Sequence, residues 1–222
     1  MTPYRTGAMH IRKPLLALAC ILTLALPGCM SISVGAYPDA ALPRADVADL
    51  ARSSAPMKLK LQVQWQLNGH APSTETGFME VKIPSPDMNV LRQKFTEAFR
   101  RTGLVEIVQA GESGTVMVTL NNVSDFGDAI DKGDQLGRRW GDGHVTNKEE
   151  YELSLLIEQR GSVAESSAVR GAYYSVVAKS KLPDDARLRP PELVFDDMLQ
   201  QMLIKCLLDM QRNGKLAGLA SR

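Results

Sequence analysis

Residues 59–67, with the sequence LKLQVQWQL, form the clearest structural pattern in this chain. Leucine, valine and tryptophan at the odd positions alternate with lysine and glutamine at the even positions. Successive side chains of a β-strand point to opposite faces, so this alternation predicts a strand with one buried face and one solvated face. Such a strand needs a sheet and a covering layer to bury its apolar row, and the flanking sequence supplies both.

A helix is expected after this strand. Ser85-Pro86-Asp87 combines an N-cap residue, a proline at the first helical position and an acid in the first turn. Apolar residues then recur at helical spacing to about Thr102, and Gly103 fits the position just past a helix C-terminus. The expected buried stripe consists of Met88, Leu91, Phe95, Ala98 and Phe99.

Further strands are indicated downstream. Residues 104–109 and 115–123, separated by a glycine-rich turn, predict a β-hairpin. Alternation over residues 150–158 and a strand at about 168–179 predict a second hairpin. A parallel, right-handed pairing of the two strands that flank the first helix is compatible with this order.

The last element is a helix that begins after Pro190-Pro191 and stops at Asn213-Gly214. Its apolar stripe includes Cys206, which is expected to be a buried, unreactive thiol. Strands and helices do not alternate beyond the first unit. The element order therefore predicts an α+β fold, with two helices packed on one face of a mostly antiparallel sheet.

The N-terminal residues 1–28 differ in composition from the rest of the chain. They contain three basic residues and no acidic residue, and a largely apolar run covers residues 15–26. Twelve residues are too few to cross a bilayer as a helix, which takes about 20, but they suit the central region of a signal peptide. We therefore expect a signal peptide over residues 1–28, with translation starting at Met1 or Met9.

Leu26-Pro27-Gly28-Cys29 resembles the lipobox of bacterial lipoproteins. In that family the chain is cleaved before the cysteine, which then carries acyl chains such as palmitate. The resemblance implies that Cys29 is the lipid attachment site and anchors the protein to a membrane without a spanning helix. Met30 stands where aspartate is the usual inner-membrane retention signal, so the resemblance implies the periplasmic face of the outer membrane.

After cleavage the chain is expected to have two parts. Residues 29–57 are rich in alanine, serine, proline and aspartate, which predicts a lipidated cysteine followed by a flexible tether. Residues 58–222 are expected to form a single periplasmic α+β domain. This domain resembles the lipopolysaccharide-assembly and curli-secretion classes of periplasmic lipoproteins through a helix-to-strand pattern formed by Leu91, Phe95, Ala98, Phe99, Gly103 and Leu104.

Charge and cysteine content exclude several function classes. A net charge of +1 gives no reason to expect nucleic-acid binding, and without residues 1–28 the net charge becomes −2. Three scattered cysteines form neither a disulfide scaffold nor a zinc site. No catalytic motif is present, so we expect no enzymatic activity, cofactor or metal, and instead an accessory or assembly module with an envelope protein partner.

Two groups of residues are candidates for partner or ligand binding. Residues 124–148 are polar and glycine-rich and are expected to form a long loop, in which Arg138-Arg139-Trp140 could bind a lipid phosphate, a glycan or an acidic partner. The aspartates of that loop make calcium an alternative, although their spacing does not match a calcium loop. Arg92, Lys94, Arg100 and Arg101 give the first helix a basic side that could face lipopolysaccharide or an anionic lipid.

Overall fold

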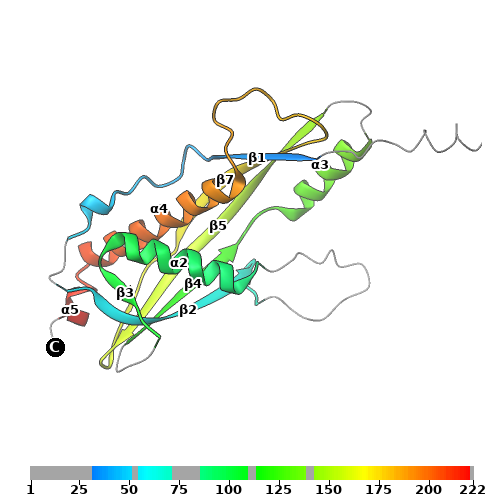
Figure 1. Cartoon of the computed structure of the whole chain (residues 1–222). Helices are drawn as coiled ribbons and strands as arrows, with labels where there is room; N and C mark the ends of the chain where they lie inside the picture. The colour runs from blue at the N-terminus through cyan, green and yellow to red at the C-terminus, as the bar shows by residue number, and fades with distance from the viewer. Residues whose placement is uncertain (1–31, 52–54, 72–85, 110–113, 139–142, 221–222) are drawn as a thin grey trace, which may run out of the picture. The chain divides into compact units, whose positions relative to one another are not determined.

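A computed structural model describes residues 32–51, 55–71, 86–109, 114–138 and 143–220 (Figure 1). Within these ranges, a seven-stranded sheet has the order β1-β7-β5-β4-β2-β3, with β6 paired to β5. The elements are β1 (Ser33–Pro38), the 3-10 helix η1 (Val47–Asp49), β2 (Met57–Leu67), α2 (Met88–Thr102), β3 (Val105–Ile107), β4 (Gly114–Asn122), α3 (Phe126–Arg138), β5 (His144–Gln159), β6 (Ser162–Glu165), β7 (Val169–Ala178), α4 (Pro191–Arg212) and α5 (Ala217–Ala220).

The strand expected at residues 59–67 is β2, and it lies between β3 and β4. Both neighbours run parallel to it, with Leu59 opposite Ile107 on one side and Gly114 on the other. The expected parallel pairing across the first helix is therefore confirmed. The first expected hairpin is wrong, because β3 and β4 do not pair with each other but flank β2. Alternation assigns side chains to a face of the sheet and leaves the neighbouring strand undetermined.

The second expected hairpin is confirmed in outline. β5 and β7 pair antiparallel, with Tyr151 opposite Gly171. Between them, the tight turn at Arg160 and Gly161 has positive φ angles of 50° and 78°, and it leads into the additional short strand β6. Glycine adopts such angles without steric cost, which explains its place in this turn.

The core lies between the sheet and two helices, α2 and α4, which lie over the same face in Figure 1. Phe95 and Phe99 of α2 and Met202 of α4 are fully buried together with Leu120 of β4 and Leu153 of β5. The predicted apolar stripe of α2 is thus confirmed, with Met88 only partly buried. The N-cap of α2 is Asp87 and not Ser85, since its side chain accepts a hydrogen bond from the backbone N–H of Asn89 at 2.8 Å.

The prediction of a long loop over residues 124–148 is wrong, because α3 occupies most of it. The Asp125 side chain accepts a hydrogen bond from the Asp128 N–H at 3.1 Å, as an N-cap residue does. Ion pairs at i,i+4 spacing join Asp128 to Lys132 at 2.6 Å and Asp134 to Arg138 at 2.7 Å. These contacts partly offset the low helix propensity of the glycines in this segment.

The chain from Ile32 to Ala51 also differs from the flexible tether expected for residues 29–57. β1 forms an edge strand of the sheet, paired antiparallel with β7. Further along, the backbone N–H of Ala45 donates to Gln201 Oε1 at 2.7 Å, and the Gln211 side chain exchanges two hydrogen bonds with the backbone of Ala51. These glutamines, distant in sequence, hold the segment along α4.

The α+β class is confirmed, whereas the finer prediction of two helices on a mostly antiparallel sheet needs correction. The sheet is mixed, with parallel pairings on both sides of β2. In addition to α2 and α4, the described residues form α3, which packs against β5, and the single-turn helix α5.

Candidate functional site

The two faces of the sheet differ in chemistry. One, termed here the covered face, carries the apolar residues under α2 and α4, such as Val116, Val118 and Leu120 of β4. The other, termed the open face, carries the alternate residues of β2, β4 and β5. These side chains are mostly polar, with charges of both signs, and they lie in rows across the three strands.

Strand register defines two such rows on the open face. Gln64, Thr119 and Ser154 are neighbours in the first row, and Gln66, Asn121 and Glu152 are neighbours in the second. In the second row, Asn121 Nδ2 donates to Glu152 at 3.3 Å, and the next strand adds Arg170, whose Nε donates to the same carboxylate at 2.7 Å. These groups are exposed or half-buried. The open face therefore offers many hydrogen-bonding groups and little net charge.

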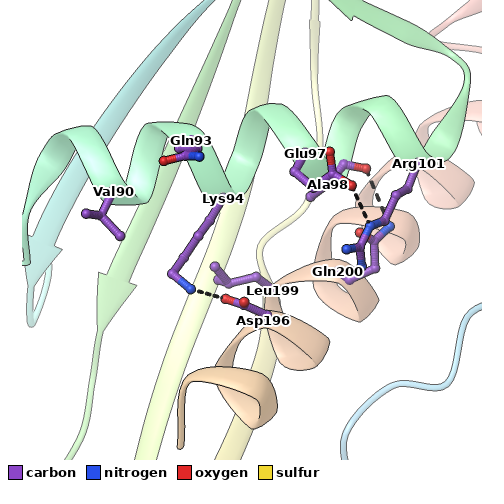
Figure 2. A pocket seen from close by; sticks show the side chains of 9 residues that line it. All are labelled: Val90, Gln93, Lys94, Glu97, Ala98, Arg101, Asp196, Leu199 and Gln200. Carbon is purple, nitrogen blue, oxygen red and sulfur yellow. Dashed lines mark hydrogen bonds and ion pairs between the residues drawn. The ribbon is translucent and has the colours of Figure 1, made fainter.

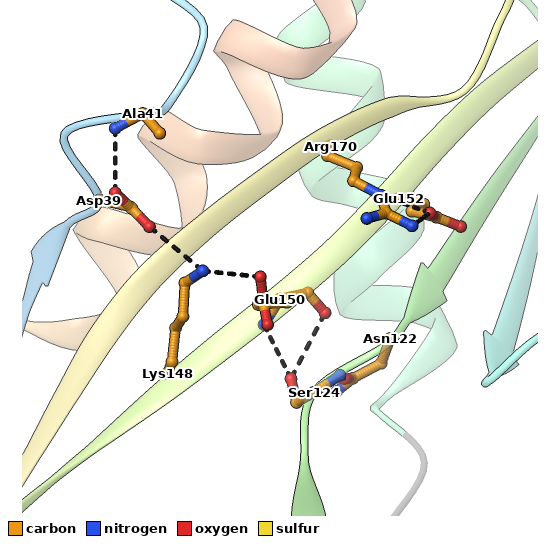
Figure 3. A network of polar contacts seen from close by, with 8 residues as sticks. All are labelled: Asp39, Ala41, Asn122, Ser124, Lys148, Glu150, Glu152 and Arg170. Atoms are coloured by element: carbon orange, nitrogen blue, oxygen red, sulfur yellow. Dashed lines mark hydrogen bonds and ion pairs between the residues drawn. The ribbon is translucent and has the colours of Figure 1, made fainter.

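A polar network fixes the segment after β1 to the sheet (Figure 3). Lys148 Nζ lies 2.7 Å from Glu150 Oε1 and 3.5 Å from Asp39 Oδ2, and Asp39 Oδ1 accepts a hydrogen bond from the Ala41 N–H at 2.9 Å. The hydrogen bond to Glu150 raises the pKa of Lys148. A cavity of about 230 Å³ lies beside these residues. Because Lys148 is ion-paired with both Glu150 and Asp39, the network attaches the segment after β1 to the sheet.

A groove of about 320 Å³ separates α2 from α4 (Figure 2). Lys94 of α2 is ion-paired with Asp196 of α4 across it. Glu97 accepts hydrogen bonds from Arg100 at 2.7 Å and from Arg101 at 3.0 Å, and these bonds lower the pKa of Glu97 to about 2. The groove lining thus contains two basic side chains and two acidic ones.

The structure brings only some of the expected ligand-binding residues together. Lys94 and Arg101 line the groove, whereas Arg92 donates to Asn89 Oδ1 at 3.2 Å. Arg138 belongs to α3 and is paired with Asp134. Arg139, Trp140 and Cys29 lie outside the described residues.

Two of the aspartates that were considered as calcium ligands form ion pairs with basic residues instead. Asp128 and Asp134 face Lys132 and Arg138 within α3. Among the residues that the structure describes, no three acidic, histidine or cysteine side chains gather as metal ligands would. Cys206 is fully buried, as expected, and burial raises its pKa to about 12.

An aromatic cluster on the covered face was not anticipated from the sequence. Tyr151 lies 6.1 Å from Trp65, 6.3 Å from Tyr173 and 5.5 Å from Phe195, measured between ring centroids. Glu149, two residues before Tyr151 on the same face, has its pKa raised by burial, although Ser175 Oγ donates to it at 3.3 Å. The period-two alternation along β5 places Glu149 on the same face as Tyr151, so its inward position could have been predicted from the sequence.

The comparisons with known proteins add no family assignment. The sequence matches none of the known protein-family models, and no curated protein matches it significantly. Among the described helices, none combines the length and apolar character needed to span a bilayer.

Proposed function

We propose that this protein is a lipoprotein on the periplasmic face of the outer membrane, anchored by acyl chains on Cys29, and that its α+β domain is a non-enzymatic accessory or assembly module of an envelope complex. The observation that carries the anchoring proposal is the order of features at the N-terminus. A basic segment, an apolar run and Leu26-Pro27-Gly28-Cys29 directly precede the folded domain, whose first strand begins four residues after Cys29.

The open face supports the proposal that the partner is a protein. Its two rows present amide, hydroxyl and carboxylate groups, with Gln64 and Thr119 as neighbours in one row and Asn121 hydrogen-bonded to Glu152 in the other. Hydrogen-bonding groups at this density and with little net charge suit the backbone and polar side chains of another protein, whose interfaces contain about one hydrogen bond per 100–200 Å².

The alternative is a binder of lipopolysaccharide or another anionic lipid through the basic side of α2 and Arg138-Arg139-Trp140. Charge pairing argues against it, and Arg138 is paired with Asp134. Lys94 is paired with Asp196, and Arg100 and Arg101 share Glu97. An anion in the groove would have to compete with these carboxylates. A protein is therefore the proposed partner, and binding of an anionic ligand is an alternative result that the experiment below would detect.

The anchor is tested with Cys29→Ser and the matched control Cys20→Ser, which changes a second cysteine of the same N-terminal region. Cys29→Ser is expected to abolish palmitate labelling, to leave a larger unprocessed form and to alter membrane fractionation. Cys20→Ser is expected to leave all three readouts unchanged. Normal processing and labelling of Cys29→Ser would overturn the lipoprotein assignment.

The partner is tested by photo-crosslinking in cells, with a photoreactive residue at Gln64 on the open face or at Gln93 in the groove between α2 and α4. We expect a discrete protein adduct from position 64 and none from position 93. A protein adduct from position 93 alone would contradict the choice of the open face. A lipopolysaccharide adduct from position 93 would favour the anionic-ligand alternative.

A further inference from the structure

Four chain segments converge at the end of the sheet where β1 begins. Ser33 is opposite Ala178 at the end of β7, and its Oγ donates to the Ser180 carbonyl at 2.8 Å. The backbone N–H of Lys179 donates to the Gly143 carbonyl at 3.1 Å, just before β5 begins. Lys179 Nζ donates to the Gly137 carbonyl of α3 at 3.3 Å. We call this region the β1 end; in Figure 1 the start of β1 and the last turn of α3 lie together.

The connection between Cys29 and the β1 end is short. Ser33 follows Cys29 by four residues, and a fully extended chain spans at most about 3.6 Å per residue, so the two Cα atoms are separated by roughly 14 Å or less. A flexible tether of the 28 residues first expected would reach roughly 30 Å on average. An acylated Cys29 would therefore hold this particular end of the domain near the lipid surface.

Exposed apolar side chains are found at the β1 end and farther along α3. Ile32 is 67% exposed and Val34 is 46% exposed, and both precede or begin the edge strand. On α3, Ile130 is 47% exposed, whereas Leu136 of the same helix is buried. Ile130 lies about 10 Å along the helix axis from Gly137, which contacts Lys179, given a rise of about 1.5 Å per residue.

We propose that the β1 end rests on the phospholipid surface, with Ile32, Val34 and Ile130 in contact with the headgroup and upper acyl region. This inference rests on the proposed lipidation of Cys29. The occupant is a lipid surface because the position of the anchor leaves little chain between these side chains and the bilayer. β5 is 16 residues long, which corresponds to roughly 50 Å. Its opposite end, with β6 and the Arg160-Gly161 turn, would therefore lie away from the lipid surface, in the periplasm.

The experiment uses the full-length lipidated protein in vesicles of phosphatidylethanolamine and phosphatidylglycerol. An environment-sensitive fluorophore is attached at Ile130→Cys or, as a matched control, at Val163→Cys. Val163 is 63% exposed and lies in β6 opposite Glu158, roughly 45 Å along β5 from His144. Cys206 is fully buried and remains unlabelled.

Spin-labelled phospholipid in the vesicles is expected to quench the fluorophore at position 130 at least threefold more than the one at position 163. Equal quenching at the two positions would overturn the proposal, as would absence of quenching at position 130 in protein that floats with the vesicles. Failure of the wild-type protein to float with the vesicles would instead overturn the lipidation of Cys29 itself, so the two failures are distinguishable.

A second variant tests whether the short connection sets the orientation. Insertion of 12 glycine and serine residues between Met30 and Ser31 would raise the root-mean-square reach of the connection from roughly 11 Å to roughly 22 Å. Quenching at position 130 is expected to fall at least twofold while flotation is retained. Unchanged quenching would contradict the claim that the short connection holds the β1 end at the membrane.

Discussion

The covered and open faces are built from the same strands but differ in burial and in side-chain chemistry. Along β5, Leu153 and Leu155 are fully buried under the helices, while Glu152 and Ser154 between them belong to the open face. Apolar burial on one face provides most of the stability, at about 25 cal/mol per Å² removed from water. Because neighbouring residues of one strand lie on different faces, the open face, where the proposed partner would bind, can be altered without removing buried apolar groups.

The largest effect is expected from truncation on the covered face. Leu153→Ala should lower the free energy of unfolding by about 2–5 kcal/mol, because it removes buried methyl groups and leaves a cavity. Its neighbour Ser154→Ala should change stability by less than about 0.5 kcal/mol. Urea denaturation of both variants measures the difference. Similar losses in the two variants would contradict the division into faces.

Glycine substitution tests how closely the strands pack. A Cβ added at Gly114, where β4 begins, would lie 2.2 Å from the Glu158 carbonyl oxygen of β5. Gly114→Ala is therefore expected to cost about 1–3 kcal/mol. In Gly133→Ala, the new Cβ on α3 meets nothing within 4 Å, and the higher helix propensity of alanine should stabilise by about 0.5–1 kcal/mol. Thermal denaturation should give shifts of opposite sign, and shifts of equal sign would refute this account.

The attachment of residues 45–51 to α4 is expected to contribute less. Gln201→Ala removes the acceptor for the Ala45 N–H, which should cost about 1 kcal/mol and speed proteolysis between Ala45 and Ala51. Gln200→Ala is the matched control, since the Gln200 side chain donates instead to the Ala98 carbonyl of α2 at 3.5 Å. Equal cleavage rates in the two variants would mean that Gln201 does not hold the segment.

The smallest expected effect concerns the carboxyl group on the covered face. Burial raises the pKa of Glu149 above its ordinary value of 4.5, so the folded state binds the proton more tightly than the unfolded state. The free energy of unfolding should therefore fall as the pH rises from about 4.5 through the raised pKa. Glu149→Gln should flatten this dependence, as measured by urea denaturation between about pH 4 and 8. An unchanged slope would assign the dependence to other groups.

Much of the fold could be predicted from local patterns. The alternation in β2, the apolar stripe of α2 and the glycine after it, and the proline-initiated helix α4 all encode which side chains turn inward. The helix α3 was predictable in part, because Asp125 and the i,i+4 pairs of α3 were visible in the sequence. Its glycines obscured that signal, since glycine lowers helix propensity by about 1 kcal/mol.

The candidate site was predicted less well. The basic residues of α2 were correctly assigned to one helix, but the sequence could not indicate that Asp196, about a hundred positions away, would pair with Lys94. The rows of the open face depend on strand register, which joins Gln64, Thr119 and Ser154 from three separate segments. Neither the ion pair between Lys94 and Asp196 nor the pairing of these strands follows from local composition.

By itself, the sequence determined the α+β class, through the order of its elements, and the inward-facing residues, through patterns within a few consecutive residues. Lipid attachment at Cys29 is likewise expected from four consecutive residues. Only the tertiary structure decided that β2 separates β3 from β4, that residues 33–38 join the sheet as β1, and that the domain therefore begins four residues after Cys29. Backbone pairing depends little on side-chain identity, so the choice among strand partners is made when the whole core is assembled.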